Sequence, residues 1–363
     1  MNQPRPLNHL LGLPAYHVAE AAVAPGNLIR LSFNEGAFGP SPLALAAYQN
    51  AAVNLHRYPD LNYAALRQAI AASNGLEVAR IVCGAGSDDL LNLLARGYAH
   101  AGDEIIYSQY GFSMYGIVTK LVGATPVVIP EKNYTLDVPA LLAAVTPHTR
   151  IVFVANPNNP TGTYINRDVL YQLHAGLPRN VLLVLDCAYA EFMTQDDYDD
   201  GMALAASEPN VVVARTFSKI HALGGMRIGW SYGSPEVADT LNRLRNPFNI
   251  AAPAAAAAIA SLGDSAFQER TRAHNAEWRD WLIAELKQLG GFDPHPSVTN
   301  FVLVGMADAE RAKALLAFLA ERCIQLRAMG GYKLADHVRI SIGKAEEMRA
   351  LVDALKLFRA QEC

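Results

Sequence analysis

The sequence predicts an α/β protein: a mostly parallel central sheet in a large domain, followed by a smaller α+β C-terminal domain. Short segments that are apolar on both faces alternate with helical patterns through the first two thirds of the chain, as parallel strands covered by helices do. From about residue 248 the pattern changes to longer helices and two short strands. The length of 363 residues favours about two domains.

Taken in order, the strands of the large domain are predicted at apolar segments bounded by polar or turn-forming residues: 81–84, 104–108, 125–130, 150–156, 180–186, 210–216 and 228–233. Between the first four of these strands, helices are predicted over 87–99, 112–123 and 138–145. The C-terminal region is predicted to contain helices over 266–290 and 309–323, and strands over 300–305 and 337–343. This mixture is typical of an α+β unit.

A Pro-Phe-Asn junction at 247–249 separates the two patterns and predicts a domain boundary. We therefore expect an N-terminal arm that joins the small domain (1–30), a large domain (31–247) and a small C-terminal domain (248–363).

Composition and charge exclude several classes of function. Apolar residues make up 51% of the chain and charged residues 18%, which excludes a disordered or low-complexity protein. The 30 basic and 34 acidic residues give a net charge of −4 without a run of Lys or Arg, so we expect neither nucleic acid nor a membrane as a partner. Small-molecule chemistry is the class that these observations favour.

The cysteines and the N-terminal segment predict a cytoplasmic protein. The four cysteines lie far apart without a Cys-x-x-Cys pair, as reduced intracellular thiols do, and the histidines have no ligand spacing, so no metal site is expected. The N-terminus lacks a basic stretch followed by a long apolar segment, and no span approaches the roughly 18 strongly apolar residues of a membrane helix.

The segment RTFSKIHALGGMRIGW (215–230) places two hydroxyls, an amine and a guanidinium after a predicted strand: Thr216, Ser218, Lys219 and Arg227. A phosphate needs several donors and fixed positive charge, whereas an aldehyde cofactor needs an amine whose pKa a cationic neighbour lowers. Both needs are met here. A solvated Lys and Arg beside a Gly-Gly turn is the alternative interpretation of this segment alone.

Polar residues also follow two other predicted strands. Asp186 ends the strand 180–186, at the edge where ligands of open α/β sheets bind. A carboxylate there is costly unless it has a partner, and a protonated pyridine nitrogen is a suitable one. Tyr189 and Asn159 are placed to present polar groups to the oxygen of the same ring. Taken singly, an Asp at a strand end is more often a cap or turn former.

The segment GAGSDD (84–89) lies between a predicted strand and a helix, so the amides of Ala85, Gly86 and Ser87 are predicted to hold an anion at the helix N-terminus. A nucleotide-binding module is the alternative here. Its usual fingerprints are incomplete, because Asp89 stands where a dinucleotide motif has its third glycine.

The motifs NPNNPTG (156–162), D-x-A-Y (186–189) and TFSK (216–219), with Arg227 eight residues after the lysine, resemble the class I/II pyridoxal-phosphate aminotransferases of fold type I. FNEGAFGPSP (33–42) and RAMGGYKLADHVRISIG (327–343) narrow the resemblance to the histidinol-phosphate aminotransferase family. It covers nearly the whole chain, and it implies that family's fold.

The resemblance implies pyridoxal 5'-phosphate as the cofactor and assigns the catalytic residues as Lys219, Asp186 and Tyr189. Lys219 would link to the cofactor and later move the substrate proton. Asp186 would pair with the ring nitrogen, Tyr189 and Asn159 would hold the ring oxygen, and Phe112 would stack on the ring. Contacts to the cofactor phosphate are implied for Ala85, Gly86, Thr216, Ser218, Arg227 and, from the other subunit of a homodimer, Tyr58.

For the substrates, the resemblance implies that Arg339 binds a carboxylate, that Arg327 lies near a substrate phosphate, and that Tyr16 and Asn159 complete the site. The implied reaction transfers the amino group of histidinol phosphate to 2-oxoglutarate in a ping-pong cycle of histidine biosynthesis. An aromatic amino-acid aminotransferase is the alternative, because the same arginines can bind another amino acid. A phospho-amino-acid decarboxylase on the same scaffold is a more distant one.

Overall fold

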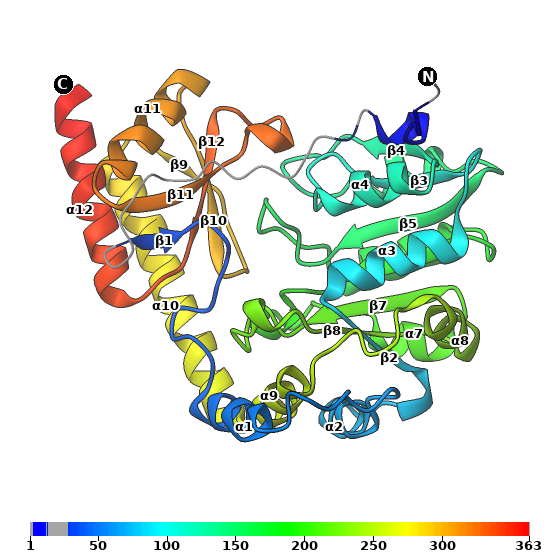
Figure 1. The fold of residues 1–363 in the computed structure, drawn as a ribbon. Helices are drawn as coiled ribbons and strands as arrows, with labels where there is room; N and C mark the ends of the chain where they lie inside the picture. Colours follow the sequence, from blue (N-terminus) through cyan, green and yellow to red (C-terminus); the bar gives the residue numbers. More distant parts are fainter. Residues whose placement is uncertain (1–2, 12, 14–27, 363) are drawn as a thin grey trace.

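The structure, a computed structural model, describes residues 3–11, 13 and 28–362. Two sheets organise this part of the chain (Figure 1). The larger sheet has the strand order β2-β8-β7-β6-β5-β3-β4, and the smaller has the order β1-β11-β12-β10-β9. These two sheets confirm the predicted fold class.

The large sheet is mostly parallel, and β8 is the strand that runs antiparallel to both of its neighbours. The strands are β2 (Ile81–Gly84), β3 (Glu104–Ser108), β4 (Thr125–Ile129), β5 (Thr149–Ala155), β6 (Leu182–Asp186), β7 (Val211–Thr216) and β8 (Gly229–Tyr232). Every residue of β6 and β7 is buried, because helices cover both faces of the sheet centre. The segment 125–130, also predicted as a two-faced apolar strand, instead forms the edge strand β4, which is largely exposed.

Helices of two groups cover this sheet. Those of the first group, on one face, include α3 (Ser87–Tyr98), α4 (Met114–Leu121) and α8 (Pro235–Leu244). Those of the second group include α1 (Pro42–Ala52), α2 (Ala64–Asn74), α5 (Val138–Ala143), α6 (Arg167–Gly176), α7 (Met202–Ser207) and α9 (Ala252–Leu262). The helical patterns at 87–99, 112–123 and 138–145 thus correspond to α3, α4 and α5.

The small sheet combines strands from both ends of the chain. Its strands are β1 (Ile29–Leu31), β9 (Asp293–Pro294), β10 (Phe301–Gly305), β11 (Ile324–Ala328) and β12 (His337–Ser341). The helices of this region are α10 (Ser265–Leu289), α11 (Ala309–Ala320) and α12 (Ala345–Glu362). Only β10 and β12 were predicted. Strands β1 and β9 are too short to show a pattern, whereas β11 was missed although its apolar and polar residues alternate.

Helix α9 bears on the domain division. Its buried alanines pack in the same core cluster as α1 and α2 of the large sheet. In Figure 1 the long helix α10 extends from beside α9 to the small sheet. The division into an N-terminal arm, a large domain and a small domain remains a proposal. The packing of α9 favours a boundary between the large and small domains after α9 rather than after residue 247.

Within residues 3–11, 13 and 28–362, no helix combines the length and the apolar character that crossing a bilayer requires.

Candidate active site

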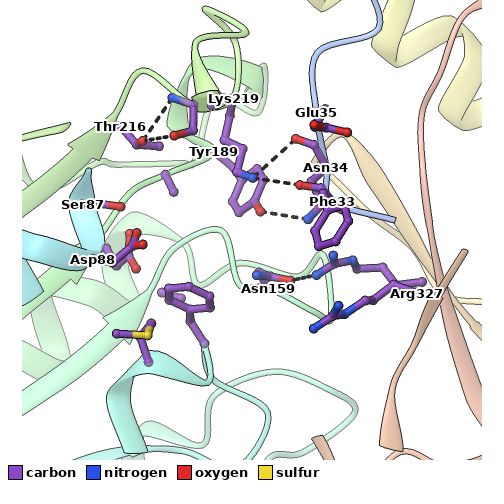
Figure 2. Close-up of a pocket in the computed structure, with 18 of the residues that line it drawn as sticks. Phe33, Asn34, Glu35, Ser87, Asp88, Asn159, Tyr189, Thr216, Lys219 and Arg327 are labelled. Carbon is purple, nitrogen blue, oxygen red and sulfur yellow. Dashed lines mark hydrogen bonds between the residues drawn. The ribbon is translucent and has the colours of Figure 1, made fainter. Parts of the chain in front are cut away.

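A cavity of about 780 Å³ lies where the carboxyl ends of three parallel strands face the small sheet. Ala155, Asp186 and Thr216, the last residues of β5, β6 and β7, line one side of it, and Arg327 and Arg339 of the small sheet line the other. Figure 2 shows Thr216 on the side of the large sheet and Arg327 on the side of the small sheet. A concave space with a few convergent polar groups is the kind that binds small molecules.

Lys219 follows β7 and reaches across the cavity toward the segment after β1. Its Nζ donates hydrogen bonds to the backbone oxygens of Phe33 (3.2 Å) and Asn34 (3.4 Å), as Figure 2 shows. Burial and the positive charge of Arg339 lower the pKa of Lys219 to about 8. The amine is therefore far more available as a base or nucleophile near neutral pH than that of an ordinary lysine.

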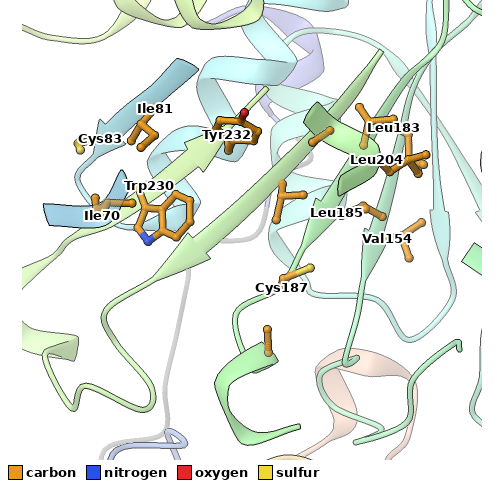
Figure 3. Close-up of a cluster of buried hydrophobic side chains, with 14 of the residues drawn as sticks. Ile70, Ile81, Cys83, Val154, Leu183, Leu185, Cys187, Leu204, Trp230 and Tyr232 are labelled. Atoms are coloured by element: carbon orange, nitrogen blue, oxygen red, sulfur yellow. The ribbon is translucent and has the colours of Figure 1, made fainter. Parts of the chain in front are cut away.

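Asp186 is 4% exposed at the end of β6. Its Oδ2 accepts a hydrogen bond of 3.0 Å from the Tyr115 hydroxyl, while its Oδ1 is buried without a hydrogen-bond partner among the described residues. Burial raises the pKa of this carboxyl to about 6. The neighbours Leu185 and Cys187 lie in the large core cluster (Figure 3), which fixes the strand end that carries the carboxylate.

Tyr189 and Asn34 form a second buried pair in the cavity wall. Asn34 Nδ2 donates to the Tyr189 hydroxyl at 2.9 Å, and Asn34 Oδ1 accepts from the Ser341 hydroxyl at 3.0 Å. The amide orientation is thus set by two partners. Because the Tyr189 oxygen already accepts a bond, its own proton is left to donate elsewhere. Burial raises the pKa of Tyr189 to about 12, so the hydroxyl keeps that proton at neutral pH.

Donors for an anion gather at the N-terminus of α3. Ser87 begins this helix, and Thr216, Ser218 and Arg227 line the cavity beside it. The backbone of β8 comes so close to this turn that a side chain at Gly229 would lie 2.5 Å from the Ser87 nitrogen. Hydroxyls, a guanidinium and a helix N-terminus together are suited to a phosphate.

Two backbone amides that are predicted to hold the phosphate make hydrogen bonds within the turn, and their contact with a phosphate stays a prediction. Ala85 and Gly86 do not line the cavity. The Ala85 N–H donates to the Asp89 carboxylate at 2.9 Å, and the Gly86 N–H donates to the Gly84 oxygen at 2.8 Å, so both amides are used within the turn. Ser87 and Asp88, which come next, face the cavity instead.

Two further predicted residues lie in the cavity. Phe112 lines it and meets Tyr115 edge-on, with ring centroids 6.0 Å apart. Asn159 lines it as well, and its side-chain oxygen accepts a hydrogen bond from the Arg339 guanidinium. Asn159 therefore contacts the arginine that is predicted to bind a substrate carboxylate, and its position near the cofactor ring stays a prediction.

Tyr58 does not line the cavity of its own chain. Tyr58 is 83% exposed and stacks on Phe248, with centroids 4.8 Å apart. That position fits a residue expected to act in another subunit, and it stays a prediction. Tyr16 lies outside the described residues.

Several lining residues escaped the sequence analysis as site residues. They are Leu13, Phe33, Asn34, Glu35, Asp88, Met114, Ile117 and Tyr332. The run Phe33–Glu35 lies within FNEGAFGPSP, a motif that carried the family resemblance, so this motif was the available signal. The φ of Asn34 is 56°, a conformation that Asn adopts more readily than most residues.

Three features meet at the ends of parallel strands: a lysine with a lowered pKa, a buried carboxylate with one oxygen open, and a set of donors suited to a phosphate. Together they define a pyridoxal-phosphate type of enzyme. The model of the aminotransferase class I and II family matches residues 26–355. A histidinol-phosphate aminotransferase of Paramagnetospirillum magneticum is 50% identical over 361 residues, which is 99% of each chain. One of Dinoroseobacter shibae is 52% identical over 334 residues, 92% of each chain.

Among solved structures, the histidinol-phosphate aminotransferase of Sinorhizobium meliloti in complex with pyridoxal-5'-phosphate superimposes with a TM-score of 0.91 at 31% identity. The match covers 100% of this chain and 99% of that one. The chain therefore belongs to the aminotransferase class I and II family and, within it, to the histidinol-phosphate aminotransferases, as its motifs predicted.

Proposed function

We propose that the chain transfers the amino group of histidinol phosphate to 2-oxoglutarate, as a pyridoxal-phosphate aminotransferase of histidine biosynthesis. The observation that carries this proposal is the pair of arginines, Arg327 and Arg339, that share a cavity with the low-pKa Lys219. The full-length similarity to histidinol-phosphate aminotransferases supports the choice of substrate.

The residues present fit the cofactor. Asp186 has a buried oxygen open to a donor such as a ring nitrogen, and Ser87, Thr216, Ser218 and Arg227 offer the donor set of a phosphate site. When bound, pyridoxal 5'-phosphate supplies an electron-accepting ring and carries the amino group between the two half-reactions. Phe112 would cover the ring, and the Tyr189 hydroxyl would donate to the ring oxygen.

Lys219 supplies the base. Its Nζ would take the proton from the substrate carbon that bears the amino group and return a proton during the second half-reaction. The pKa of the amine, about 8, is close to neutral pH, so the amine can both accept and donate a proton under these conditions. Asp186, when ionised, would hold a proton on the ring nitrogen.

The arginines would hold the substrates. Histidinol phosphate is dianionic at its phosphate, and two guanidiniums can meet that charge with bidentate hydrogen bonds. 2-Oxoglutarate would use the same two groups for its two carboxylates. One cavity would thereby serve both halves of the cycle.

A homodimer is part of the proposal. Large apolar side chains are exposed in and after α1 and near the end of α8: Leu43, Leu45, Val53, Leu55, Tyr58, Leu61 and Phe248. Exposed apolar side chains that gather in one region of a protein commonly mark a protein interface. A second copy of the chain is the expected partner, and Tyr58 would then reach the phosphate site of that copy. A cytoplasmic location, predicted from the sequence, fits small soluble substrates.

The test is a panel of half-reactions. The cofactor-loaded enzyme absorbs visible light, so each candidate amine is mixed with it and the loss of that absorption is followed. Histidinol phosphate is expected to give the highest specificity constant, and Lys219→Ala is expected to bind cofactor without reacting. A higher specificity constant for phenylalanine or tyrosine would replace this proposal with an aromatic aminotransferase.

A further inference from the structure

Behind the cavity wall lies a tyrosine that the predicted mechanism does not use. Tyr115, near the start of α4, is 1% exposed, and its hydroxyl donates to Oδ2 of Asp186 at 3.0 Å. We propose that Tyr115 is a positioning residue: it occupies one carboxylate oxygen of Asp186 and leaves the other for the ring nitrogen of the cofactor. This inference rests on the proposed cofactor role of Asp186.

The packing around Tyr115 fixes its hydroxyl in place. Its ring stacks on Phe153 with centroids 5.0 Å apart and planes 5° from parallel, and it meets Phe112 edge-on. These three rings lie in or against one buried cluster. A ring held on two sides cannot swing its hydroxyl away from Asp186 without disrupting the cluster.

Strand alternation explains why the carboxylate and the hydroxyl meet. Along β6, Leu182 and Val184 lie in the same cluster as Tyr115, whereas Leu183 and Leu185 lie in the cluster on the opposite face. Asp186 continues the first series, because side chains two apart share a face. The Asp186 carboxylate therefore lies on the face of the sheet that α4 covers.

Electrostatics favour a permanent donor at this position. Burial and the nearby Asp186 charge raise the pKa of the Tyr115 phenol well above its ordinary value, so the proton stays on the phenol. The hydrogen bond in turn opposes the effect of burial on the pKa of Asp186. An ionised Asp186 is the form that pairs with a protonated ring nitrogen, so loss of the phenol weakens that pair.

The experiment compares Tyr115→Phe with Tyr107→Phe. Tyr107 is a matched control, because its ring packs on Tyr115 at 6.1 Å between centroids, and no hydrogen bond joins it to Asp186 in the described part of the chain. Affinity of the cofactor-free enzyme is measured for pyridoxal phosphate and for an analogue with carbon in place of the ring nitrogen. Unfolding temperatures establish that both variants fold.

Tyr115→Phe is expected to weaken binding of pyridoxal phosphate about tenfold or more, since hydrogen bonds to charged groups are the stronger ones. It should leave the analogue's affinity unchanged, as should Tyr107→Phe for both ligands. In an Asp186→Asn background, Tyr115→Phe should add no further loss, because the two residues act as one unit.

Other outcomes separate the two ideas. Equal weakening of both ligands by Tyr115→Phe would mean that the tyrosine only supports the wall, and the inference would fail while the role of Asp186 stands. Wild-type affinity of Asp186→Asn for pyridoxal phosphate would instead overturn the proposed role of Asp186, and the inference with it.

Discussion

Arg327 on β11 lies directly opposite Arg339 on β12 in an antiparallel pair, and both side chains line the cavity. Cross-strand partners point to the same face of a sheet, and like charges in that position destabilise the pair. Arg339 is buried, and its guanidinium donates to the Ser32 backbone oxygen at 2.9 Å and to Asn159. An anion bound between the two guanidiniums would offset their repulsion.

This geometry predicts unequal effects of removing the two arginines. Arg327→Ala should lower the specificity constant for histidinol phosphate about 10- to 100-fold and change that for phenylalanine little, because a monoanionic donor needs one arginine. Arg339→Ala should damage both reactions, since it also removes a buried partner of Asn159. Steady-state kinetics with both donors provides the test. If Arg327→Ala leaves the specificity constant for histidinol phosphate unchanged, Arg327 does not bind the substrate phosphate.

The residues that follow the parallel strands were predictable from the sequence. Asp186 and Thr216 end buried strands, and Lys219 follows one, so the local pattern places all three at one edge of the sheet. Their roles were implied by the family resemblance. The two small-sheet arginines were reachable through family resemblance alone, because the local sequence does not give the register in which β11 pairs with β12.

Other features depend on tertiary contacts or local competition. Asn34 and Tyr189 are 155 positions apart, and a three-residue strand such as β1 has no periodicity that would place the first of them. The motif GAGSDD also does not disclose that the amides of Ala85 and Gly86 make hydrogen bonds inside the turn. The alanine-rich sequence of α9 does not indicate whether this helix packs against the large sheet or the small one.

The bond between Asn34 and Tyr189 can be separated from the backbone role of Asn34. Asn34→Gly keeps a residue that tolerates a φ of 56° but loses the bonds to Tyr189 and Ser341. It should slow the half-reaction about fivefold, the effect of a typical hydrogen bond. Asn34→Ala should slow the half-reaction by the same factor and also lower the free energy of unfolding by about 1 kcal/mol through backbone strain.

Half-reaction rates and thermal unfolding of both variants supply the comparison. A Tyr189→Phe background serves as the control, because Asn34→Gly should then have no further effect on rate. Wild-type rates for Asn34→Gly would show that Asn34 only shapes the turn.

The buried Asp186 should make the cofactor-free chain less stable as pH rises. Its pKa is about 6 in the folded chain against an ordinary value of 3.8, so the folded state binds this proton more tightly than the unfolded state. Stability contributed by that proton is therefore present below about pH 4 and lost as pH rises to about 6.

Asp186→Asn cannot ionise, and above pH 6 the cofactor-free variant should be more stable than the wild type by on the order of 2–3 kcal/mol. The difference should shrink as pH falls toward 4. Thermal unfolding of both chains across this range tests the sign. A difference that does not depend on pH would mean that the substitution acts through packing rather than through charge.

The last prediction concerns the shared site. If Tyr58 of one subunit completes the phosphate site of the other, Lys219→Ala and Tyr58→Ala homodimers both lack complete sites. A mixed dimer has one site with Lys219 from one chain and Tyr58 from the other, and a second site with neither. Random mixing makes half of the dimers mixed, so about a quarter of the wild-type activity should return when the two inactive proteins are unfolded and refolded together.

Phe248→Ala is the companion variant, because Tyr58 stacks on Phe248 within one chain and loses that support. It should lower activity less than Tyr58→Ala, since the hydroxyl remains. Ultracentrifugation during the mixing experiment follows the oligomeric state. Absence of any recovered activity in verified mixed dimers, or full activity in a monomer, would contradict a site built from two chains.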